Sequence, residues 1–74
     1  MIKELDLVVL TRDLPASKLN RGDIGTVVLV HGDGAGYEVE FATLAGETLA
    51  VLTLPASDVR PITRRDVAHV REVA

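Results

Sequence analysis

Short runs of aliphatic and aromatic residues, separated by turns that contain glycine or proline, divide this chain into five predicted β-strands. The clearest run alternates strictly: Tyr37, Val39 and Phe41 face one way, while Glu38 and Glu40 face the other. The strands are predicted at residues 5–11, 24–31, 37–42, 48–54 and 60–62. Five short strands at even spacing favour a small all-β barrel.

Glycine marks the corner that leads into the second strand. Gly22 and Gly25 stand three residues apart in a polar segment that opens into an aliphatic run. Glycine adopts positive φ angles and sharp bends without a Cβ penalty, so we expect Gly22 in a tight turn and Gly25 in a bulge at the start of the strand. The other connections are predicted as a long loop at 12–23, a glycine-rich hairpin loop at 31–36, and a single 3₁₀ turn at 55–59 before the last strand.

The core is predicted from the alternation of the strands. Tyr37, Val39 and Phe41 are expected at its centre because they form the aromatic side of the most regular strand. Their expected companions are Val8, Leu10, Val27, Leu29, Leu49 and Val51.

Three of the strands carry apolar residues on both faces, whereas a small antiparallel barrel ordinarily has polar residues on its outer face. One set from each strand must therefore point outward. The predicted outward set is Leu7, Val9, Val28, Val30, Ala50 and Leu52. An exposed apolar surface of this size favours a protein–protein interface; the alternative is that the C-terminal tail and the 12–23 loop cover it.

The last twelve residues, 63–74, have a different periodicity. Thr63 and Asp66 resemble a capping box, and Val67, Val70 and Ala74 fall on one helical face. A helix this short is marginal in water unless it packs against something, so two outcomes stay open: a docked helix or a frayed tail. The expected organisation is a barrel at 1–62 followed by this tail.

Composition limits the class of protein further. The chain has 74 residues, no cysteine and a net charge of −3, and it begins with no apolar signal segment. We expect one small cytoplasmic domain without a membrane span. Its acidic charge and its two aromatic residues argue against nucleic acid as the partner.

No group of residues forms a convincing catalytic, metal or cofactor site. The segment 31–34 (His-Gly-Asp-Gly) is short of metal ligands and has no following P-loop lysine, so we interpret it as a solvated hairpin. Glu38 and Glu40 are interpreted as an outward acidic stripe, and Asp66 with His69 as a pair on a helix surface. We therefore expect no enzymatic activity, no cofactor and no small-molecule substrate.

Three sequence features together resemble a known family: the segment 22–28 (Gly-Asp-Ile-Gly-Thr-Val-Val), the segment 37–41 (Tyr-Glu-Val-Glu-Phe), and a Gly-Glu-Thr turn before an apolar strand. The chain is similar, over about residues 5–62, to small bacterial proteins classed as a domain of unknown function. The resemblance implies an SH3-like barrel, with a layout like that of KOW modules and the nitrile hydratase β-subunit barrel. It implies no functional residues, because the family has no settled activity.

The function expected from these observations is that of a non-catalytic protein-binding module. Its partner is either a second copy of the chain or a different protein, to which it is an accessory or antitoxin-like subunit. The alternative is a KOW-like nucleic-acid or ribosome-associated adaptor, suggested by the barrel resemblance and by Arg64 and Arg65 in the tail.

Overall fold

All five predicted strands are present in the computed structural model, which describes residues 1–73. Their bounds are β1 Leu7–Leu10, β2 Ile24–His31, β3 Gly36–Ala42, β4 Thr48–Pro55 and β5 Val59–Pro61. Three 3₁₀ turns join them: η1 Pro15–Ser17, η2 Gly32–Gly34 and η3 Ala56–Asp58. The all-β class and the 3₁₀ turn before the last strand are confirmed, although β1 is shorter than predicted.

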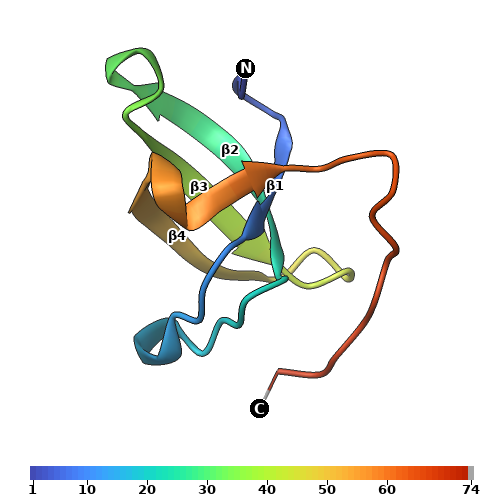
Figure 1. The fold of residues 1–74 in the computed structure, drawn as a ribbon. Coiled ribbons are helices and arrows are strands. Elements are labelled where there is room, and N and C mark those ends of the chain that lie inside the picture. Colours follow the sequence, from blue (N-terminus) through green and yellow to red (C-terminus); the bar gives the residue numbers. More distant parts are fainter. Residues whose placement is uncertain (74) are drawn as a thin grey trace.

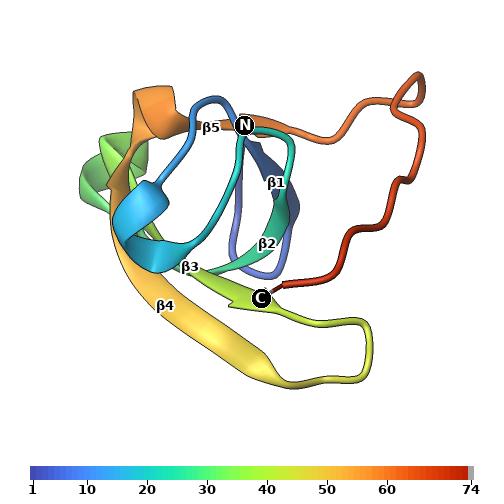
Figure 2. The same ribbon diagram turned by 90° about the horizontal axis from the view of Figure 1, so that it is seen from below.

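The strands form one antiparallel sheet in the order β4-β3-β2-β1-β5. Successive hairpins pair β1 with β2, β2 with β3 and β3 with β4, and the chain then returns to place β5 beside β1 (Figure 1). Figure 2 shows how strongly the sheet bends, with β4 along one side of the molecule and β1 and β5 across from it. Within residues 1–73 no ladder joins β4 to β5, so the sheet is open.

The core lies on the concave side of the sheet. Its central residues include Tyr37, Val39 and Phe41, as predicted, together with Val8, Leu10 and Val27. Leu19, Leu54 and Val59 complete the buried cluster and were not predicted. Each such side chain contributes roughly 1.5–3 kcal/mol when it is removed from water.

Three predicted core residues are wrong: Leu29, Leu49 and Val51 are exposed. Val27 pairs with Val39, but Leu29 pairs with Glu38, the neighbour of Val39, so a bulge between them adds one residue to β2. The bulge inverts the alternation and turns Leu29 to the outer face.

The alternation of β4 is also opposite to the prediction, here because of its register with β3. Phe41 pairs with Ala50 and Val39 with Leu52, so Ala50, Leu52 and Leu54 face the core. Leu49 lies where the register with β3 shifts, between the partners of Phe41 and Ala42. The inward set of this strand is therefore the even-numbered one.

The two glycines of the predicted corner have different roles. Gly22 has φ +95°, which confirms the turn. Gly25 pairs regularly with Val8, and the bulge of β2 lies farther on, so the bulge predicted at Gly25 is wrong. A Cβ at Gly25 would lie 2.8 Å from Cε1 of Phe41 and closer still to Val39, so close packing is what requires glycine here.

The tail forms no helix over residues 63–73; Ala74, the third member of its predicted apolar face, lies outside the described residues. The capping contacts do form, because the Thr63 N–H donates to the Asp66 carboxylate (2.7 Å) and the Arg65 N–H donates to Thr63 Oγ1 (3.2 Å). The chain beyond them is extended, and Val67 and Val70 are exposed. Figure 1 shows the tail leaving β5 in a wide loop.

Candidate interaction surface

The six residues predicted to point outward separate into three groups. Leu7 and Val28 are exposed. Val9 is buried, although it alternates with Val8 and Leu10 and is not part of the core cluster. The prediction is wrong for the other three: Val30 and Leu52 pack partly against the core, and Ala50 lies opposite Phe41. The inverted alternation of β2 and β4 explains these three.

A different set of apolar residues is exposed on the convex face of the sheet. We call it the outer apolar surface: its members are 39–52% exposed and comprise Leu7, Ile24, Val28, Leu29, Leu49 and Val51. Four of them lie on β1 and β2, and two lie on β4. The acidic residues of β3 separate these two parts, because Glu40 lies between Thr26 of β2 and Val51 of β4.

The acidic stripe predicted on β3 is present on the outer face. Glu40 pairs with Val51 and accepts a hydrogen bond from Thr48 Oγ1 (2.6 Å). Glu38 lies 3.2 Å from Nε2 of His31. Charge is strongly segregated around this stripe, because the β3–β4 hairpin, residues 36–55, contains three acidic residues and no lysine or arginine. The β3–β4 half of the sheet is therefore an acidic surface.

The tail is attached to the sheet by two ion pairs. Arg60 of β5 donates two hydrogen bonds to Asp66 (2.8 and 3.0 Å), which lower the pKa of Asp66 and raise that of Arg60. Arg71 binds Asp23, just before β2, and also the carbonyl of Lys18 (3.3 Å). Val9 pairs with Arg60, which binds Asp66, and with Ile24, which follows Asp23.

The backbone of β4 has a free edge. The Ala56 N–H donates to the Ala35 carbonyl (3.1 Å), so these two residues form a hydrogen-bonded pair at the end of the β3–β4 ladder. Bonded and non-bonded pairs alternate in an antiparallel ladder, so Leu54, Leu52 and Ala50 bond to β3. Val51 and Thr53 consequently direct their N–H and C=O groups away from β3, toward the open edge.

Two shallow hollows lie beside the sheet. One, of about 290 Å³, separates η1 from the end of β4 and is lined mainly by Leu14, Pro15, Leu52 and Leu54, with Arg12 among its other residues. Figure 2 shows η1 next to this part of β4. The other, of about 560 Å³, lies between the N-terminal residues and the end of β2.

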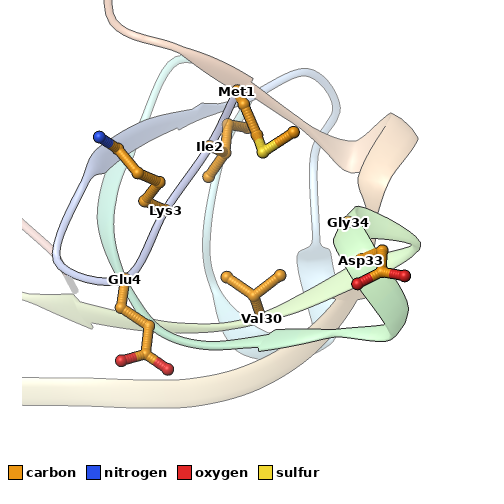
Figure 3. Close-up of a pocket in the computed structure, with 7 residues that line it drawn as sticks. All are labelled: Met1, Ile2, Lys3, Glu4, Val30, Asp33 and Gly34. Carbon is orange, nitrogen blue, oxygen red and sulfur yellow. The ribbon is translucent and has the colours of Figure 1, made fainter.

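The N-terminal hollow has an apolar floor and a polar rim. Figure 3 shows Ile2 and Val30 pointing toward each other across it, while Lys3, Glu4 and Asp33 point in different directions. The three charged groups do not converge on one point, so they form no constellation for acid–base or nucleophilic chemistry.

The remaining candidate residues are placed as follows. Asp66 binds Arg60, so its predicted pairing with His69 on a helix surface is wrong. Over residues 1–73, no group of three or more His, Cys, Asp or Glu side chains is arranged to hold a metal ion. The sequence reasoning missed Asp58, which is buried and whose Oδ1 lies 3.0 Å from Nε of Arg12. Its position at the end of a Pro-Ala-Ser-Asp turn was the only signal available.

A model of a protein family matches residues 4–61, which is most of the chain. The chain belongs to the family described as Domain of unknown function (DUF4926). Comparisons with curated proteins and with solved structures found no match. None of the helical turns described within residues 1–73 is long and apolar enough to cross a bilayer.

Proposed function

We propose that this DUF4926 protein is a non-catalytic protein-binding module that associates with another polypeptide through the outer face of its sheet. The observation that carries the proposal is the outer apolar surface. Six large side chains on three strands remain about half exposed, although full burial of such a side chain is worth roughly 1.5–3 kcal/mol. Exposed apolar area that is rimmed by polar residues marks interaction sites on soluble proteins.

The tail supports this interpretation, because it covers only part of the face. It binds Arg60 and Asp23 beside this face, whereas Leu7, Ile24 and Val28 stay exposed. We also propose that the domain has an SH3-like layout, which the strand order and the 3₁₀ turn before β5 support.

The charges favour a protein partner over nucleic acid. Arg60 and Arg71 already bind Asp66 and Asp23, and the β3–β4 half of the sheet is acidic. Phosphate binding there would work against the local field. The KOW-like adaptor therefore remains the weaker alternative; absence of RNA binding at low salt, where phosphate contacts are strongest, would remove it.

The test compares lysine substitutions on and off the surface. Leu7→Lys with Val28→Lys, and separately Leu49→Lys with Val51→Lys, place charge on the two parts of the outer apolar surface. Leu44→Lys is the control, because Leu44 is exposed in the turn between β3 and β4. Light scattering over a concentration series measures self-association, and affinity capture from the source organism measures binding to other proteins.

The proposal predicts that an oligomer or a captured partner is lost in at least one double variant and retained in Leu44→Lys. A protein that is monomeric at every concentration and captures the same background with all variants would overturn it.

A further inference from the structure

The open edge of β4 combines three features that one kind of partner would satisfy. We propose that β4 binds an extended basic segment of a different protein, which adds to the sheet as a further strand with apolar and basic residues in alternation. This inference rests on the binding function proposed above and specifies the chemistry of the partner.

The first feature is the backbone of β4. Val51 and Thr53 direct N–H and C=O groups to the open edge, and the strand is 8 residues long without a charged side chain. Soluble proteins ordinarily protect such edges with lysine, proline, bulges or very short strands. Here proline stands only at the end of the strand, in Pro55, and the register shift lies at Leu49, so residues 50–54 form a regular edge. The opposite edge, β5, is by contrast 3 residues long and ends in Pro61.

The second feature is the hollow between η1 and β4. It follows the same edge on the inner side of the sheet and is lined mainly by Leu14, Pro15, Leu52 and Leu54. Successive side chains of an added strand point to opposite faces, so every second one would enter this hollow. Apolar side chains fit there, because the cationic group at the hollow, Arg12, is already bound to Asp58.

The third feature is the charge of the outer side. The remaining side chains of an added strand would lie next to Val51 and Thr53, with Glu40 and Glu38 on the following strand. Lysine and arginine can pack their alkyl stems on Leu49 and Val51 while their charged ends reach these carboxylates. With no lysine or arginine in residues 32–59, these acidic side chains have no cation of their own hairpin to meet.

A second copy of this chain is a poorer occupant of the edge. Pairing β4 with β4 would bring two acidic β3–β4 hairpins together and would supply no basic residue to either. A segment with alternating basic and apolar residues satisfies the backbone, the hollow and the acidic stripe at once.

The experiment uses the full chain and three synthetic peptides as long as β4. The first alternates lysine with valine, the second alternates glutamate with valine, and the third has the charge of the first but carries proline at alternate positions, which prevents strand pairing. We expect only the first to bind. Binding should slow hydrogen exchange at the Val51 and Thr53 amides and shift their resonances, and should weaken as salt is raised.

Two variants separate backbone pairing from charge. Val51→Pro removes an edge N–H that does not bond to β3, so it should lower the affinity for the lysine–valine peptide by about tenfold or more while the protein stays folded. Glu38→Gln with Glu40→Gln should weaken binding and reduce its salt dependence. Glu4→Gln with Glu72→Gln makes the same change in net charge at exposed positions off this surface and should not alter binding.

Equal binding of the proline peptide, unchanged exchange at Val51 and Thr53, or a dimer formed through β4 would each overturn the proposal. Those results leave the binding function standing if a partner is lost with Leu7→Lys and Val28→Lys. Both proposals fail if, in addition, no lysine variant alters association.

Discussion

Arg71 in the C-terminal tail binds the carboxylate of Asp23, 48 residues earlier in the chain, through both Nε and Nη2. Asp23 is held in place for this contact, because it also accepts a hydrogen bond from the Asn20 N–H (2.7 Å). The pair fixes an otherwise extended segment to the loop that leads into β2. The tail is thus ordered by charge rather than by helix formation.

Arg71→Gln should release the tail without unfolding the domain. The pair lies at the surface, and such pairs contribute little to global stability. We expect faster hydrogen exchange and earlier proteolytic cleavage within residues 63–73, with a melting temperature close to that of the parent protein. Arg64→Gln is the control, since it removes the same charge from the tail without removing this contact. Equal exchange rates in the two variants would contradict the assignment.

The attachment of the tail through Arg71 and Asp23 should be lost at acidic pH. Burial raises the pKa of Asp23, but the hydrogen bonds from Arg71 and from the Asn20 N–H outweigh it and hold the pKa below its ordinary value. A depressed pKa in the folded state stabilises the attached form above the unfolded value of about 3.9, and this stabilisation is lost as the pH falls through the folded pKa. The side-chain N–H resonances of Arg71 should therefore report an intact contact from neutral pH to about pH 4 and its loss below that pH. Release near pH 6 would contradict this prediction.

Gly25 should be far less tolerant of substitution than Gly22. Gly25→Ala forces a methyl group against Phe41 and Val39, and overpacking of this kind costs about 1–3 kcal/mol or more. At Gly22, nothing lies within 4 Å of an added Cβ, and only the positive φ opposes it, at a cost of about 1 kcal/mol. Chemical denaturation of both variants measures the difference. A larger loss for Gly22→Ala would show that the backbone, not packing, sets the requirement.

The orientation of β4 predicts a contrast between two apolar residues. Leu54→Ala should cost about 2–4 kcal/mol, because the side chain is buried in the core cluster. Val51→Ala should cost less than about 0.5 kcal/mol, because Val51 faces outward. Denaturant midpoints of the two variants decide the register. A larger cost at Val51 would place the odd-numbered residues of β4 inward.

The strands, their order along the chain and the centre of the core could be predicted because local patterning determines them. Tyr37, Val39 and Phe41 alternate with glutamates, and this pattern leaves one possible orientation for β3. On β2 and β4, apolar residues occupy both faces, so the pattern carries no information about which set is inward. The bulge at Val28 decides the inward set of β2, and the register with β3 decides that of β4; both are non-local properties that these strand sequences alone do not contain.

The prediction of a helix in the tail is wrong for a similar reason. Thr63 and Asp66 make the local contacts of a helix start, which the spacing predicted. Asp66 and Arg71 then form ion pairs with Arg60 and Asp23, which lie outside the predicted helix, and Asp23 is 48 residues before Arg71. The existence of an outward apolar surface was predicted from the excess of aliphatic residues. Three of its six predicted residues are wrong because the alternation of β2 and β4 is inverted, and a fourth, Val9, is buried.

The buried carboxylate of Asp58 predicts an unequal response to the loss of two arginines. Arg12 Nε lies 3.0 Å from Oδ1 of Asp58, while Oδ2 is buried with no hydrogen-bond partner within residues 1–73. Arg12→Gln leaves a buried charge without its cation, and we expect a loss of about 1–3 kcal/mol. Arg21→Gln removes the same charge from an exposed side chain and should change stability by less than about 0.5 kcal/mol. Equilibrium unfolding of both variants at neutral pH gives the comparison. Equal values would mean that solvent, rather than Arg12, compensates the charge of Asp58.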